Sequence, residues 1–267
     1  MTTLVVLGSG SQGNAFALVH DSAILLLDAG FSLREIDRRL SAAGLDPSAL
    51  VGVAVTHEHG DHALGATKLA KRHGIPLLAS MGTWRGLARG GEPCDWLPLG
   101  SHGVAAVGPF AISACATSHD AAEPIALGVV VADGCSLGLA TDLGRPTQAV
   151  RWLLRQRHCL VLEANHDATM LRASGYPLVV QDRIAGPGGH LSNAECAELL
   201  AELHHPALAT VVLAHLSQRC NTAELAHSTV AMRLAEAGFG GELVVAAQHG
   251  PMAPITLTAP VQGTLFR

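Results

Sequence analysis

The chain is poor in aromatic and charged side chains. Only 3% of its 267 residues are Phe, Trp or Tyr, with a single tyrosine, and 15% are Asp, Glu, Lys or Arg. So few rings leave little for an extended base-stacking platform. The net charge of −5 and the absence of long Lys/Arg blocks argue against a broad duplex-binding surface. Binding of nucleic acid at a confined site stays open, because metal ions in a cleft supply positive charge that such counting omits.

Long apolar runs and a targeting signal are also absent. The longest apolar stretches have the length of strands, so we expect no transmembrane helix and no association with membranes. Residues 1–7 lack a basic segment and are typical of a strand rather than of a signal peptide. The six cysteines form no C-x-x-C pair, which favours reduced thiols. We therefore expect a cytoplasmic protein, and the sequence leaves its oligomeric state open.

The hydrophobic content of 49% predicts a globular chain, and we expect one domain over residues 1–267 because no repeat or low-complexity tract interrupts it. Apolar runs predict strands, many of them buried on both faces. The expected strands cover residues 3–7, 15–19, 23–27, 51–55, 75–79, 111–115, 126–131, 136–140, 159–162, 210–214 and 243–247.

Helices are expected where capping residues precede apolar stripes. Ser32 with Glu35, and Ser192 with Glu195, predict two capping boxes. Further helices are expected over residues 63–73, from Thr147 to about residue 157, and from residue 221 or 222 to about residue 237. Strands and helices in both halves favour an α/β fold with two sheets packed face to face and helices outside, a four-layer αββα sandwich. An open doubly wound sheet has the same periodicity.

The segment 57–62, with the pattern H-x-H-x-D-H, directly follows the apolar run 51–55. Imidazole and carboxylate ligands together suit Zn²⁺ or Mn²⁺, with Fe²⁺ as a further option. His57 and His59 would serve one ion, and Asp61 with His62 a second ion beside it. This arrangement is typical of two-metal hydrolases, in which a hydroxide shared by both ions attacks the substrate. We therefore expect two divalent metal ions as cofactors.

Three further ligand candidates follow other strand-like runs. His119 would complete the shell of the first ion, Asp142 would bridge both ions, and His215 would complete the second shell. His249, which also follows an apolar run, competes with His215 for the last position. Asp28 either holds a ligand histidine by accepting its second ring N–H or forms a turn.

Catalytic roles are predicted for Asp61, His166 and His190. Asp61 or a neighbouring histidine would handle the proton. His166 follows a strand at the same sheet edge, and His190 precedes a helix N-terminus that could bind an anionic oxygen. The glycine-rich segment 8–13 follows a strand, but a second strand is expected next, which excludes a dinucleotide fingerprint. We expect a loop at the edge of the active site whose amides and serines contact the substrate.

Together these motifs resemble the metallo-β-lactamase superfamily, and more narrowly its YycJ/WalJ-like branch. The similarity spans about residues 4–230 and includes segments 7–14, 25–30, 162–167, 189–193 and 213–217. The resemblance implies an αββα sandwich and a binuclear site. It assigns His57, His59 and His119 to one metal, Asp61, His62 and His215 to the other, and Asp142 to the bridging position. Gly60 stands where the family pattern has serine, which removes a hydroxyl but no ligand.

The resemblance also implies a metal-dependent hydrolase, and exonuclease activity on DNA is expected of this branch. The first hypothesis is therefore a phosphodiesterase that acts on single-stranded DNA or DNA ends, with 5′-to-3′ polarity. The alternative is a hydrolase of a small molecule, namely a cyclic phosphodiester, a thioester or a lactone. The acidic pI of about 6.3 and the few aromatic residues favour this alternative.

Overall fold

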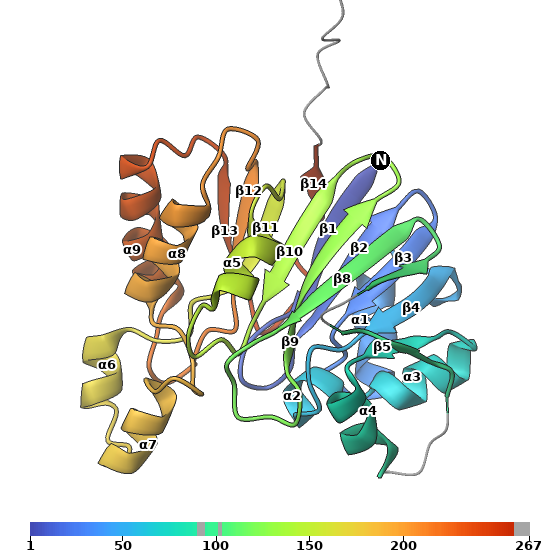
Figure 1. Ribbon diagram of the computed structural model, residues 1–267, viewed down its shortest axis with the longest axis horizontal. Helices are drawn as coiled ribbons and strands as arrows, with labels where there is room; N and C mark the ends of the chain where they lie inside the picture. The colour runs from blue at the N-terminus through green and yellow to red at the C-terminus, as the bar shows by residue number, and fades with distance from the viewer. Residues whose placement is uncertain (90–93, 101–102, 259–267) are drawn as a thin grey trace, which may run out of the picture.

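The computed structural model describes residues 1–89, 94–100 and 103–258, and within them two seven-stranded sheets pack face to face (Figure 1). The first sheet has the order β14 (Ile255–Leu257), β1 (Thr2–Gly8), β2 (Ala15–His20), β3 (Ala23–Leu27), β4 (Leu50–Ala54), β5 (Leu77–Ala79), β6 (Trp96–Pro98). The second has the order β13 (Glu242–Val245), β12 (Thr210–Ala214), β11 (Cys159–Glu163), β10 (Ser136–Ala140), β9 (Ile125–Val131), β8 (Phe110–Ala116), β7 (Val104–Val107).

Helices cover the outer face of each sheet. The first sheet carries α1 (Leu33–Ala42), α3 (Ala66–His73) and α4 (Met81–Ala88), and the second carries α5 (Gln148–Leu154), α8 (Asn193–Leu203) and α9 (Ala223–Glu236). The short helices α2 (Gly60–Ala63), α6 (Ala168–Ala173) and α7 (Leu178–Ile184) lie at one end of the sandwich (Figure 1), and a 3₁₀ turn (Pro47–Ala49) precedes β4. The predicted four-layer αββα sandwich is confirmed, and a single open sheet is excluded. No helix in the described ranges is long and apolar enough to span a membrane.

Alternation along the strands explains the layers. In β3, Leu25 and Leu27 belong to the core between the two sheets, whereas Ile24 and Leu26 pack against α1 and α3. Successive side chains of a strand point to opposite faces, so a strand covered on both sides needs an uninterrupted apolar run. This requirement is why the central strands could be predicted within one or two residues.

The elements missed by the sequence are short and peripheral. Strands β6, β7 and β14 lie at sheet edges, where a brief pairing segment needs no continuous apolar run. Helix α4 contains Gly82 and Gly86, which weaken a helical pattern, and α6 and α7 bury few side chains. Such elements depend on what the rest of the fold places beside them.

Two helix predictions need correction. The helix expected over residues 63–73 is α3 and begins only at Ala66, while Ala63 ends the separate short helix α2, because the chain between the two approaches the loop before α1. A Cβ on Gly65 would lie only 2.4 Å from the carbonyl oxygen of Phe31. The capping box at Ser192 is confirmed. At Ser32 only half of it forms, since the hydroxyl accepts the N–H of Glu35 at 3.3 Å while the Glu35 carboxylate pairs with two arginines of α1.

Candidate metal centre

Loops at one end of the sandwich bring together ligand-type side chains from both sheets. The segment from β4 to α2 belongs to the first sheet, whereas the loops after β8, β10 and β12 belong to the second. The ends of parallel strands meet at one edge of a sheet, where binding sites of α/β proteins commonly form. The residues that converge here are the seven predicted ligands, His57, His59, Asp61, His62, His119, Asp142 and His215.

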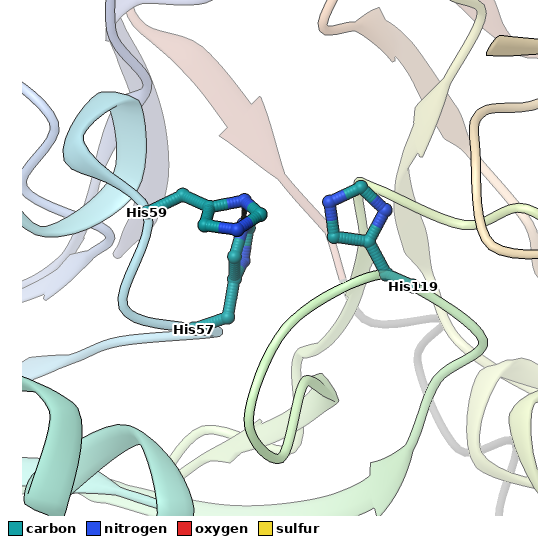
Figure 2. Close-up of side chains that lie close together, drawn as sticks. All are labelled: His57, His59 and His119. Atoms are coloured by element: carbon teal, nitrogen blue, oxygen red, sulfur yellow. Dashed lines mark hydrogen bonds between the residues drawn. The ribbon is translucent and has the colours of Figure 1, made fainter. Parts of the chain in front are cut away.

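The first ligand group consists of His57, His59 and His119. One ring nitrogen of each lies within 4.8 Å of the others, and His57 Nε2 is 3.1 Å from His59 Nδ1. Figure 2 shows His57 and His59 on the β4–α2 loop facing His119, which approaches from the loop after β8. Three imidazole nitrogens at this spacing can share one cation.

The second group consists of Asp61, His62 and His215, whose ligand atoms also lie within 4.8 Å of one another. Asp142 lies between the two groups. Its Oδ2 is 2.7 Å from His62 Nε2, and its Oδ1 is 3.5 Å from His119 Nε2. A carboxylate with one oxygen toward each group has the position required of a bridging ligand.

Hydrogen bonds on the far side of three rings determine which nitrogen faces the centre. The Nδ1–H of His62 donates to Asp28 Oδ2 at 2.7 Å, that of His215 to Glu163 Oε1 at 2.8 Å, and that of His119 to the Gly189 carbonyl at 3.1 Å. In the neutral form of each ring, the lone pair of Nε2 therefore faces the centre. A partner on the second ring nitrogen is typical of metal-binding histidines.

The donor set fits divalent metal ions. Asp142 Oδ2 is buried and has no hydrogen-bond partner among the described residues, although His62 Nε2 lies 2.7 Å away. When His62 is neutral, its one ring hydrogen is directed at Asp28, so the lone pair of Nε2 faces the Asp142 oxygen across this short gap. A cation that accepts both would satisfy them. Nitrogen and oxygen ligands in this ratio suit a transition metal or zinc better than Mg²⁺ or Ca²⁺.

The electrostatics of the second group also favour cations. Burial lowers the pKa of His62, but the carboxylates of Asp142 and Asp28 outweigh burial and hold this pKa well above its ordinary value. Burial likewise opposes a charge on His215, yet Asp142 and Asp61 raise its pKa to about 10. The negative potential that stabilises a proton at these rings would also stabilise a metal ion.

In the first ligand group, burial has the larger effect on the pKa of the histidines. Burial, followed by the nearby His62, holds the pKa of His57 well below its ordinary value. Burial also lowers the pKa of His119. Both rings are therefore neutral near pH 7, the form in which imidazole binds a metal.

The backbone is left-handed at three of these positions. Asp28, Asp142 and His215 have φ values of 58°, 53° and 55°, and each lies one or two residues after the end of a strand. Non-glycine residues rarely adopt this conformation, and it persists only where the surroundings enforce it. At His215 the N–H donates to the buried Ser9 hydroxyl at 2.8 Å. The turn directs each side chain into the end of the sandwich.

A cavity of about 360 Å³ opens onto the centre. His57 and His62 are fully buried beneath it. Its polar lining includes His59, Asp61, His119, Asp142, Asn165, His190 and His215. A substrate in the cavity would reach both ligand groups from the same side.

The remaining predicted residues differ in position. His190 lines the cavity, and its Nδ1–H donates to Glu163 Oε1 at 2.8 Å. His166 is buried and is not part of the cavity lining, so its catalytic role stays a prediction. His249 is exposed and belongs to none of the ligand groups among the described residues, whereas His215 does.

The glycine-rich loop mainly supports the centre. Ser11 lines the cavity, as expected, but Ser9 and Asn14 are buried behind it. Asn14 accepts the Ser9 hydroxyl at 2.8 Å, and its amide lies 3.2 Å from His62 Nε2 and 3.3 Å from the Asp61 carbonyl. These contacts of the loop hold Asp61 and His62 of the second group in position.

Glu163 was not among the candidates from the sequence. It is fully buried, and its Oε1 accepts the Nδ1–H of both His190 and His215 at 2.8 Å. Burial raises the pKa of this carboxyl, but His190 outweighs burial and lowers it to about 2. The signal in the sequence was a carboxylate at the end of an otherwise apolar buried strand.

Comparisons with known proteins agree with the fold and the ligand pattern. Residues 24–216 match the β-lactamase superfamily domain. The chain therefore belongs to the metallo-β-lactamase superfamily. The fold and the His/Asp clusters together indicate a divalent metal ion.

Within the superfamily the chain is similar to two proteins named exodeoxyribonucleases. It is 34% identical to exodeoxyribonuclease YycJ of Bacillus anthracis over 238 residues, which cover 88% of this chain and 90% of the relative. It is 32% identical to exodeoxyribonuclease WalJ of Streptococcus pneumoniae over 240 residues, which cover 88% and 89%. The metallo-β-lactamase fold protein YhfI from Bacillus subtilis superposes with a TM-score of 0.71 at 15% identity, covering 92% of this chain and 96% of that protein, which supports the fold.

Proposed function

We propose that the chain is a metal-dependent exonuclease that hydrolyses phosphodiester bonds of DNA at strand ends or in single strands. The observation that carries the proposal is the pair of three-ligand groups on either side of a buried carboxylate at the floor of one cavity. The similarity to exodeoxyribonucleases over most of the chain supports a DNA substrate over a cyclic phosphodiester, a thioester or a lactone.

Two divalent cations, Zn²⁺ or Mn²⁺, would occupy the centre. His57, His59 and His119 would hold one, Asp61, His62 and His215 the other, and Asp142 would contact both. When bound, such ions lower the pKa of water and stabilise the negative charge that develops on phosphate oxygens.

Side chains of the cavity would orient the substrate and move the proton. Glu163 holds the Nδ1–H of His190, so the other side of this ring is available to donate to a phosphate oxygen or to the leaving oxygen. Asp61 is 30% exposed and lines the cavity. Burial opposes its charge, but His215 and His62 hold its pKa well below the ordinary value, so the ionised carboxylate could orient a water there by accepting its hydrogen. His215 is held by Glu163 and by the Asn165 amide, which donates to the His215 carbonyl at 2.9 Å, and these contacts keep its ring beside Asp61.

The experiment measures release of nucleotides from end-labelled single-stranded and duplex DNA with Mn²⁺ or Zn²⁺ added. We expect cleavage that a chelator abolishes and that His59→Ala lowers by at least about 100-fold, since a lost metal contributes several kcal/mol to the barrier. His227→Ala, an exposed histidine of α9, serves as the control with wild-type activity. Unchanged cleavage by His59→Ala or by metal-stripped protein would contradict the proposal.

A further inference from the structure

One wall of the cavity is apolar and comes from the segment around α6 and α7. Tyr176, Val180 and Ile184 line this wall, and the last two lie one helical turn apart on α7. The lining also includes the hydroxyls of Ser11 and Ser217. A ligand over the metal centre would therefore have both apolar side chains and hydroxyls within the same cavity.

Tyr176 is held firmly in this wall. It is half-buried and is the single tyrosine of the chain. Its carbonyl accepts the side-chain amide of the buried Gln181 at 2.8 Å, and its N–H donates to the Ser174 hydroxyl at 3.2 Å. An aromatic ring that lines a polar cavity and is fixed at its backbone offers a flat surface to a ligand.

A cation lies over the ring of Tyr176. The guanidinium carbon of Arg219 is 4.3 Å from the ring centroid, and its Nε–H donates to the Ser174 carbonyl at 2.9 Å. Arg219 is exposed and belongs to the loop after β12, which also carries His215. The pair thus joins the apolar wall to the metal centre and places positive charge near the cavity.

We infer that Tyr176, backed by Arg219, stacks on the base of a terminal nucleotide of single-stranded DNA while the adjacent phosphodiester lies over the metal centre; this inference rests on the proposed function. Every base has a π face and can stack on an aromatic ring, so stacking adds binding affinity without sequence preference. The cavity of about 360 Å³ lies at the small end of ligand sites and fits a nucleotide-sized group better than a duplex. One ring also suffices for one base in a chain with so few aromatic residues.

The test compares KM and kcat for two oligonucleotides that differ only at their ends. One carries ordinary terminal nucleotides, and the other carries tetrahydrofuran abasic nucleotides at both termini. We expect Tyr176→Ala to raise KM for the ordinary strand about tenfold, within the range for loss of one base–aromatic stack. The same variant should barely change KM for the abasic strand, and Tyr176→Phe should behave as wild type on both.

Matched variants separate stacking from a structural role. Trp152 is the matched control: its exposed ring on α5 also lies under a guanidinium, that of Arg155, but outside the cavity. Trp152→Ala should therefore leave KM unchanged. Arg219→Gln, a change at an exposed residue that spares the ring, should raise KM for the ordinary strand several-fold.

Equal losses on both strands, or no effect of Tyr176→Ala and Arg219→Gln, would overturn the stacking subsite while leaving the exonuclease proposal intact. Absence of any DNA cleavage by the wild-type protein with Zn²⁺ or Mn²⁺ would overturn the proposed function and this inference with it.

Discussion

Asp28 restrains a ligand of the second group from behind. Its Oδ1 accepts the N–H and the hydroxyl of Thr56 at 2.8 and 3.0 Å, and its Oδ2 accepts the Nδ1–H of His62 at 2.7 Å. A carboxylate in this position prevents ring rotation and increases the basicity of the other nitrogen. The structure therefore favours the supporting role over a simple turn.

We predict that Asp28→Asn weakens zinc binding about 10- to 100-fold with the fold retained, because the ring of His62 loses its charged partner. Competition with a chromophoric chelator measures the affinity, and circular dichroism verifies the fold. Asp46→Asn is the matched control, since Asp46 also accepts a main-chain N–H (that of Ser48, 2.9 Å) but is exposed and distant from the centre. An unchanged zinc affinity in Asp28→Asn would show that His62 is positioned by other contacts.

Glu163 acts on two rings at once. Its carboxylate accepts hydrogen bonds from His190 and His215, and also from the main-chain N–H groups of Leu143 and Leu191 at 2.9 and 3.2 Å. Each of these hydrogen bonds requires an acceptor oxygen. A glutamine there has one oxygen and turns an N–H toward a donor.

We predict that Glu163→Gln lowers kcat for DNA about 10- to 100-fold, the range for lost partners of metal ligands. Glu202→Gln changes an exposed carboxylate that pairs with Arg151 and should leave kcat unchanged. Zinc affinity measured in parallel distinguishes a misplaced His215, which weakens binding, from a misplaced His190, which lowers kcat alone. Wild-type values of both quantities would exclude a positioning role.

At the level of elements, helix α1 is tied to the glycine-rich loop through Arg39. This guanidinium is 6% exposed and donates to the carbonyls of Leu7 and Gln248 at 2.6 and 3.1 Å. Glu35 neutralises it at 2.7 Å. Arg38, followed by Arg39, holds the pKa of Glu35 at about 2, although burial opposes this shift.

We predict that Glu35→Gln lowers the free energy of unfolding by about 1 kcal/mol at pH 7, since the pair is partly exposed. The pKa of Glu35 is lower in the folded chain than in the unfolded chain, so its contribution is complete above about pH 4.5 and is lost as the pH falls toward 2. Urea denaturation at pH 7, 4.5 and 3.5 measures the difference between variant and wild type. Glu198→Gln, at an exposed pair with Arg233, should change little. A difference that does not vary with pH would contradict this account.

At the level of the whole molecule, the candidate ligands connect the two sheets. The β4–α2 segment contributes to both ligand groups, and each group is completed by a residue from the second sheet, His119 or His215. A bound ion would therefore link the two halves of the sandwich and bind the folded chain alone.

We predict that Zn²⁺ or Mn²⁺ raises the temperature of a single cooperative unfolding transition, and that a chelator reverses the shift. At 1,000 times the dissociation constant a ligand adds about 4 kcal/mol, or roughly 8–16 °C for a chain of this size. Differential scanning calorimetry measures the shift, with Ca²⁺ as the control because it prefers oxygen ligands. An equal shift with Ca²⁺, or none with any transition metal, would contradict a metal centre built from both sheets.

How much of this site could be predicted depends on the distance along the chain. His57 to His62 are close in sequence and follow a buried strand, so their proximity needs no knowledge of the fold. His119, Asp142 and His215 could be proposed as ligands because each follows an apolar run, and the family resemblance implied the same assignment of each to a metal. The structure brings all of them together.

Packing decided which residues outside the cluster at 57–62 take part in the site. His215 and His249 both follow apolar runs near the end of the chain. The N–H of Ala246 donates to the Leu213 carbonyl, and the N–H of Ser9 donates to the Ala247 carbonyl. The chain after β13 therefore runs beside the glycine-rich loop, and His249 is left exposed. Glu163 stands out as a carboxylate that ends an apolar strand, but neither this position nor that of Tyr176 indicates which side chains packing places beside it.

The sequence by itself determined the alternation of apolar strands and capped helices and the cluster of ligands after β4, because these patterns act between neighbouring residues. The tertiary structure decided which distant side chains complete the centre, which carboxylates support its histidines, and where an aromatic ring lines its cavity. Those choices depend on how two sheets pack at one edge, and side-chain contacts across that edge have no counterpart in residue spacing.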